Sequence, residues 1–146
     1  MAKTIALIAS LDTKKKETLY AASVIQKQGF STYIIDISTK NLVDGADITP
    51  VEILKRYGIE WEDFDPLGKA ASIDVMSKAA AFVLPQLYAE GKFDVVISIG
   101  GGQNAKMAAM AMKNCCVKIS TSLAYRGGMW RQDIAYDTMI FVEQYY

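Results

Sequence analysis

Three consecutive glycines, Gly100, Gly101 and Gly102, separate an apolar run from an alanine- and methionine-rich segment, and Gln103 and Asn104 follow them. Glycine has no Cβ, so it accepts a positive φ and lets a ligand approach the backbone. The amides at the start of the next helix would then face a concave site suited to a phosphate. The pattern is not specific by itself, because Ala105 replaces the last glycine of a dinucleotide fingerprint. A structural glycine turn and a phosphate cradle both fit.

A second polar cluster follows the apolar run at 4–10. Asp12 and Thr13 precede three lysines, Lys14 to Lys16. In the first turn of a helix the macrodipole disfavours each cation by up to ~1 kcal/mol. An anionic ligand nearby would relieve this cost, and three solvated lysines are the alternative. Asp12 and Thr13 could cap the helix in either case.

A third cluster consists of the hydroxyls Ser120, Thr121 and Ser122, at the end of an apolar run at 117–121. Hydroxyls at the carboxyl end of a strand commonly line a site, and surface Ser and Thr residues are the alternative. Parallel strands place their exit loops on one side of a sheet, so we expect all three clusters to meet at one rim. The predicted ligand-binding residues are therefore Asp12, Thr13, Lys14, Gly100, Gly101, Gly102, Gln103, Asn104, Ser120, Thr121 and Ser122.

Composition predicts one globular domain over residues 1–146, with 51% hydrophobic and 22% charged residues. The 16 basic and 16 acidic residues cancel, so a nucleic-acid partner is not indicated. No stretch approaches the ~20 apolar residues of a membrane-spanning helix. The apolar run at the N-terminus is too short for a signal peptide. A cytoplasmic protein is expected.

The sequence contains no histidine, which removes His-based triads and His-metal sites. Cys115 and Cys116 are adjacent, a spacing that strains a disulfide and fits no zinc pattern, so they are interpreted as buried reduced thiols. No metal-ligand set is evident, and no catalytic residue is assigned.

Apolar, weakly alternating runs predict parallel strands near 4–10, 31–37, 93–99 and 117–121, with a further strand within 137–144. Helical segments lie between them. This order predicts an α/β fold, a three-layer, Rossmann-like, doubly wound and mainly parallel sheet of about five strands. The first and third strands should be adjacent at the switch point.

The helices are predicted from periodicity and end signals. One follows a loop at 11–14 and ends near Gly29, and another runs from Pro50 to a stop at Gly58. A long helix should be capped by Ser72, end near Glu90 and kink at Pro85. The last should cover 103–113.

Several motifs together resemble a known family. LDTK at 11–14 follows the first strand. Gly100 and Gly101 follow the strand that begins within the motif AEGKFDVVI at 89–97, and Ser120 and Thr121 come at the end of the next strand. The combination, with LYAEG at 87–91, resembles the amino-terminal domain of the tomato mosaic virus resistance protein family. That family comprises ATP-binding proteins with many uncharacterised bacterial members. The resemblance implies ATP as the ligand and a second, barrel-like domain as a partner.

Three functions stay open at this point. The preferred one is a nucleotide-binding Rossmann-like domain that binds ATP, with Mg²⁺ brought by the nucleotide. A stand-alone kinase or nicotinamide-dependent oxidoreductase is the second; Asp36 ends the second strand where a ribose-binding acid belongs, but the glycine fingerprint is missing. The third is an interaction or oligomerisation module that has lost nucleotide binding. Aromatic residues at the carboxyl end, Phe141, Tyr145 and Tyr146, favour a homodimer.

Overall fold

A computed structural model describes residues 2–113, 115 and 120–124 of the chain. Four parallel strands form one sheet in this part, namely β1 (Thr4–Ala9), β2 (Ser31–Asp36), β3 (Val95–Gly100) and β4 (Ser120–Ala124). Their order is β2-β1-β3-β4, so β1 and β3 are adjacent at the switch point as the sequence predicts. A sheet of five strands is not supported, and the run at 137–144 lies outside the described residues.

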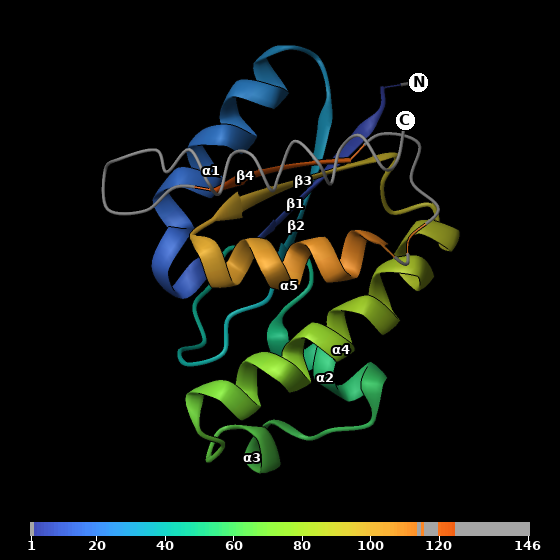
Figure 1. The fold of residues 1–146 in the computed structure, drawn as a ribbon. Coiled ribbons are helices and arrows are strands. Elements are labelled where there is room, and N and C mark those ends of the chain that lie inside the picture. The colour runs from blue at the N-terminus through green and yellow to red at the C-terminus, as the bar shows by residue number, and fades with distance from the viewer. Residues whose placement is uncertain (1, 114, 116–119, 125–146) are drawn as a thin grey trace.

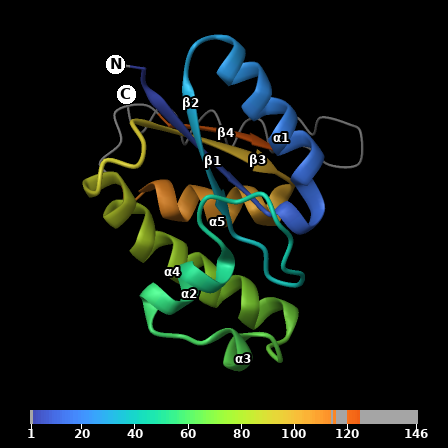
Figure 2. The ribbon, with the colours of Figure 1, turned by 180° about the vertical axis from the view of Figure 1, so that it is seen from behind.

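Helices cover both faces of the sheet (Figure 1). Helix α1 (Leu11–Lys27) lies on one face. Helices α4 (Lys69–Ala89) and α5 (Gly102–Lys113) lie on the other, and α2 (Pro50–Tyr57) packs outside the sheet against α4. The view from behind shows the same three layers, with the short α3 (Trp61–Phe64) at the end away from the sheet (Figure 2). The predicted three-layer α/β arrangement is confirmed in the described residues.

Strand β1 is central and has no solvent-facing side. Its residues Ala6, Leu7, Ile8 and Ala9 are all buried, because helices cover both faces. Strand β3 alternates instead: Val96 packs in the core under α4 and α5, whereas Ile97 faces α1. The two faces of the sheet therefore carry separate hydrophobic clusters, and the loops at the carboxyl edge are held by a rigid base.

The fourth strand differs from its prediction at 117–121. Strand β4 begins at Ser120, which pairs with Val96, and ends at Ala124, which pairs with Gly100. Residues 117–119 lie outside the described residues. The neighbouring β3 sets this register, whereas sequence propensity alone favours the more apolar run before it. The shift moves the Ser120–Ser122 hydroxyl cluster from the strand's end to its beginning and middle.

Helix ends were predicted with mixed success. Helix α2 begins at Pro50 and is ended by Gly58, which has φ 95°, as expected. The structure adds a capping box at its start, formed by Thr49 and Glu52. Helix α4 is capped by Gly68 and begins at Lys69, so Ser72 lies inside it and donates its hydroxyl to the Lys69 carbonyl. The capping prediction for Ser72 is wrong, because a Ser hydroxyl bonds a carbonyl within a helix as readily as it caps one.

Two further predictions concern the start of α1 and the course of α4. Helix α1 begins at Leu11 instead of after a loop at 11–14, although Lys14 has non-helical angles of φ −128° and ψ 23° that separate the first turn from the rest. Helix α4 runs through Pro85 as one element to Ala89, and the kink at Pro85 stays a prediction. Of the two cysteines, Cys115 is buried and forms no disulfide, as expected, and Cys116 lies outside the described residues.

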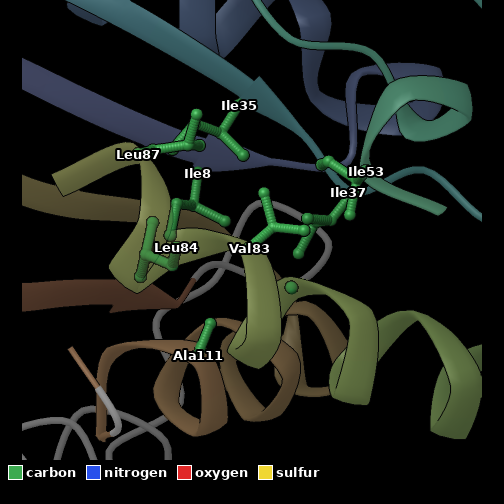
Figure 3. Close-up of a pocket in the computed structure, with 9 residues that line it drawn as sticks. Ile8, Ile35, Ile37, Ile53, Val83, Leu84, Leu87 and Ala111 are labelled. Carbon is green, nitrogen blue, oxygen red and sulfur yellow. The ribbon is translucent and has the colours of Figure 1, made fainter. Parts of the chain in front are cut away.

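A small cavity of about 10 Å³ lies inside the core between the sheet and the helices (Figure 3). Its lining is wholly aliphatic and comes from β1, β2, α2, α4 and α5: Ile8, Ile35, Ile37, Ile53, Ala80, Val83, Leu84, Leu87 and Ala111. A bound water needs two to four polar partners, which this lining does not offer. The cavity is a packing void, and the polar carboxyl edge of the sheet is where a ligand site must be sought.

Candidate anion-binding site

The turn between β3 and α5 leads directly into a helix start. Ala105 donates its amide to the Gly101 carbonyl at 2.8 Å, the first intrahelical bond of α5. The amides of Gly102, Gln103 and Asn104 precede that bond, so helix geometry gives them no carbonyl one turn earlier. The helix macrodipole adds partial positive charge at the same place. This end of α5 has the chemistry that holds an anion.

Asn104 uses its side chain within the protein. Its Nδ2 donates to the Ile99 carbonyl at 2.9 Å, and its Oδ1 accepts the Ser10 hydroxyl at 2.7 Å. A Cβ on Gly100 would lie 2.1 Å from Nδ2 and 2.6 Å from the Asn104 Cβ. Gly100 therefore makes room for this folded-back side chain. One donor and one acceptor position of the Asn104 side chain are thus taken by the protein.

The glycines of the turn do not adopt the left-handed backbone that the sequence led us to expect. Within the described residues, positive φ is found at Gly29, Gly45, Gly58 and Gly91, and Gly100 to Gly102 are not among them. Their lack of a side chain matters for space: at Gly100 the occupant is Asn104.

The bond between Ser10 and Asn104 joins the two exit loops of the central strands. Ser10 follows β1 and Asn104 lies in the first turn of α5 after β3, 94 residues apart in the sequence. The predicted meeting of the loops after β1 and β3 at one rim is therefore confirmed. This rim is the switch point where ligands bind in open α/β sheets.

The start of α1, on the same rim, is closed by the protein itself. The Leu11 amide donates to Asp36 Oδ1 at 3.0 Å, and the Asp12 amide donates to the Ser38 hydroxyl at 3.0 Å. The next two amides, of Thr13 and Lys14, both donate to the Ser10 carbonyl, at 3.1 and 2.9 Å. All four amides of this helix start have a protein acceptor.

Asp36 is the centre of that closure. It is fully buried, and its Oδ1 accepts the Leu11 amide together with the amide and hydroxyl of Ser38. Its Oδ2 is buried and has no hydrogen-bond partner among the described residues. Burial raises the pKa of Asp36, against the lowering effect of the hydrogen bonds from Ser38 and Leu11. From the sequence alone, Asp36 is interpreted only as a candidate ribose-binding acid. The signal that could have indicated its role is the Ser two residues later, because an Asp side chain often accepts the backbone amide two residues on.

The lysines of the α1 start have carboxylates beside them. Lys14 Nζ lies 3.6 Å from Glu17 Oε1, and Lys15 forms an ion pair with Asp44 of the loop at 38–49. Thr13 donates its hydroxyl to the Ser10 carbonyl at 3.3 Å. The anionic groups that the lysine cluster led us to expect are thus supplied, at least in part, by the chain.

The backbone of the third cluster does not lie beside the α5 turn at the rim. Ser122 pairs with Ser98, in the middle of β3, and Ala124 is the residue of β4 opposite Gly100. The structure therefore brings together the groups at 12–14 and 100–104 and places the backbone of Ser120, Thr121 and Ser122 further back along the sheet.

The described residues contain no group of three or more His, Cys, Asp or Glu residues that could hold a metal ion. No helix in the same part of the chain is long and apolar enough to cross a membrane.

The fold and the rim define a doubly wound α/β domain with its central exit loops joined at the switch point. The chain belongs to uncharacterised protein family UPF0261, whose N-terminal domain matches residues 3–120. This match corrects the assignment to the tomato mosaic virus resistance protein family. That assignment rested on short motifs, whereas the family match spans most of the chain.

A UPF0261 protein from Clostridium tetani (strain Massachusetts / E88) is 28% identical over 116 residues, which cover 77% of this chain and 28% of that protein. The chain thus spans about a quarter of the length of this relative. A crystal structure of UDP-N-acetylglucosamine 2-epimerase aligns with 99% of this chain and 37% of its own, with a TM-score of 0.46 and 11% identity. A likeness at this level does not bear on function.

Proposed function

We propose that this domain binds a nucleotide, with ATP as the first candidate, and that the phosphates contact the first turn of α5. The observation that carries the proposal is the position of that turn. It lies at the switch point, is joined to the loop after β1 through Ser10 and Asn104, and offers the amides of residues 102–104.

In this proposal the rest of the nucleotide extends from the α5 turn along the rim. The base would lie toward the loop at 38–49, where Leu42 is exposed. Lys14, whose amide bonds the Ser10 carbonyl, would add positive charge from the α1 side. Mg²⁺ would come with the nucleotide and be held mainly by its phosphates. In a protein of the length of the Clostridium relative, the remaining chain would complete the activity.

The test is a thermal-shift panel of ATP, ADP, AMP and NAD, followed by calorimetry. A ligand at 100 times its dissociation constant should stabilise the protein by roughly 2.7 kcal/mol. Gly101→Val places a branched side chain on the turn and should abolish ATP binding by blocking the approach of the phosphates. Gly68→Val is the matched control, because Gly68 also precedes a helix and has open space around it.

ATP binding that persists in folded Gly101→Val would place the site elsewhere. Absence of binding at millimolar nucleotide would favour the second candidate, an interaction or oligomerisation module. Exposed apolar side chains on α1, at Leu19, Tyr20 and Val24, support that alternative; Tyr20 is 72% exposed. Light scattering at tens of micromolar protein should then detect a homodimer. A monomer at this concentration would rule out the homodimer.

A further inference from the structure

Two features of a dinucleotide site are altered at this rim. In dinucleotide-binding folds the pyrophosphate lies at the start of the helix after the first strand. An acid at the end of the second strand holds the ribose hydroxyls. Helix α1 and Asp36 occupy these two places. The start of α1 and the carboxyl of Asp36 can therefore be compared with what a bound dinucleotide requires.

The start of α1 already holds a carboxyl group. Asp36 Oδ1 accepts the Leu11 amide, and the Ser38 hydroxyl accepts the Asp12 amide while donating to the same Oδ1. A pyrophosphate would have to displace these acceptors to reach the amides. It would also meet the charge of the carboxylate at short range, where like charges repel strongly.

The same acid is out of reach for a sugar. Asp36 is fully buried, Oδ1 takes three donors from Leu11 and Ser38, and Oδ2 is enclosed as well. A ribose hydroxyl could contact Asp36 only after the bonds between β2 and α1 had opened. Neither half of the dinucleotide mode is accessible.

We infer that Asp36 is a specificity-determining residue, which closes the start of α1 and confines ligand phosphates to the β3–α5 turn, so that mononucleotides are accepted and dinucleotides are rejected. The inference rests on the proposed function for its ligand class. The lysines at 14 and 15 fit it, because Glu17 and Asp44 lie beside them. Asp36 acts through the helix amides, and no contact between Asp36 and the bound mononucleotide is required.

The test measures ATP, NAD and inorganic pyrophosphate by calorimetry on the full chain and on Asp36→Ala, Asp36→Asn and Ser38→Ala. In the unaltered protein we expect ATP to bind and NAD to fail. Asp36→Ala frees the Leu11 amide and removes the charge, so pyrophosphate affinity should rise roughly tenfold, the factor that matches one charge-assisted hydrogen bond. Asp36→Asn keeps the shape and one acceptor oxygen, so its gain should be smaller, and Ser38→Ala should give an intermediate gain.

Asp36→Asn keeps the test decisive if Asp36→Ala does not fold. Unchanged pyrophosphate affinity in the folded variants would overturn the inference. NAD binding in the unaltered protein that Asp36→Ala abolishes would do the same, because Asp36 would then hold the ribose. Loss of ATP binding in every protein, including the unaltered one, would contradict the proposed function, whereas a gain of pyrophosphate binding would still support the closure of α1.

Discussion

Helices α1 and α5 begin side by side at the carboxyl edge of the sheet, after the adjacent strands β1 and β3, yet their first turns differ. The four amides at the start of α1 all have acceptors, from Asp36, Ser38 and the Ser10 carbonyl. The amides at 102–104 of α5 precede the first helical bond. Equal positions in the fold therefore differ in what the adjacent chain supplies: Asp36 and Ser38 provide acceptors for the amides at the start of α1.

The difference comes from what the adjacent chain delivers. Asp36, the last residue of β2, and Ser38, two residues later, bring a carboxylate and a hydroxyl to the start of α1. At α5 the polar side chain is Asn104 of the helix itself, which folds back onto Ile99 and Ser10 because Gly100 leaves it space. Asn104 thereby connects the turn to the end of β3 and to the loop after β1.

The largest effect is expected at Gly100, where the α5 turn depends on an absent side chain. Gly100→Ala places a Cβ 2.1 Å from Asn104 Nδ2, so the amide side chain must leave and two hydrogen bonds break. Urea unfolding should show a loss of roughly 2–4 kcal/mol. Adding Asn104→Gly should recover the overpacking part of the loss, and Gly68→Ala should change little. A stable Gly100→Ala protein would show that Asn104 does not hold the turn.

The positions of the two helix starts could be predicted from the sequence, but the closure of α1 by Asp36 could not. The apolar runs of β1 to β3, the start and stop signals Pro50 and Gly58 of α2, and the glycine turn predicted the fold and the rim. The closure of α1 depends on Asp36, 25 residues from Leu11, and a bond at that separation leaves no local pattern. The start of β4 was missed for a related reason, since β3 sets its register. Local rules place elements, but contacts between distant loops decide which groups stay available.

The next effect concerns pH, because the closed helix start holds a buried carboxyl. Burial raises the pKa of Asp36 above its ordinary 3.8, so the folded protein keeps this proton where the unfolded chain has released it. Stability from this group is present below pH 3.8 and is lost as the pH rises through the raised pKa. Urea unfolding at a series of acidic pH values should show that the unaltered protein loses stability relative to Asp36→Asn as the pH rises. A difference that stays constant with pH would contradict this.

A smaller effect is expected for the charge beside the closed helix. Lys14→Ala should weaken ATP binding by about 1 kcal/mol, the low end for a charge-assisted bond, because Lys14 also lies beside Glu17. Lys16→Ala, at an exposed neighbour, is the control. Calorimetry would contradict a role for Lys14 if the two variants bound ATP equally well.

The smallest effect is expected at Ser98, which lies in β3 behind the open turn. Its hydroxyl is buried and has no partner among the described residues. Ser98→Ala removes a polar group that gains nothing in the folded state, so unfolding should show a change between zero and about 1 kcal/mol of stabilisation. A clear loss of stability would show that this hydroxyl has a hydrogen-bond partner in the folded protein, and that a polar contact in β3 stabilises the fold.

In the proposed binding mode, α5 offers its helix start to a phosphate and α1 does not. Amide chemical shifts of the ¹⁵N-labelled protein, followed during titration with ATP and with inorganic phosphate, test both helices at once. We expect the amides of Gly102, Gln103 and Asn104 to shift in a saturable way while those of Leu11 and Asp12 stay in place. Saturable shifts at Leu11 and Asp12, or none at either helix with millimolar nucleotide, would contradict this binding mode.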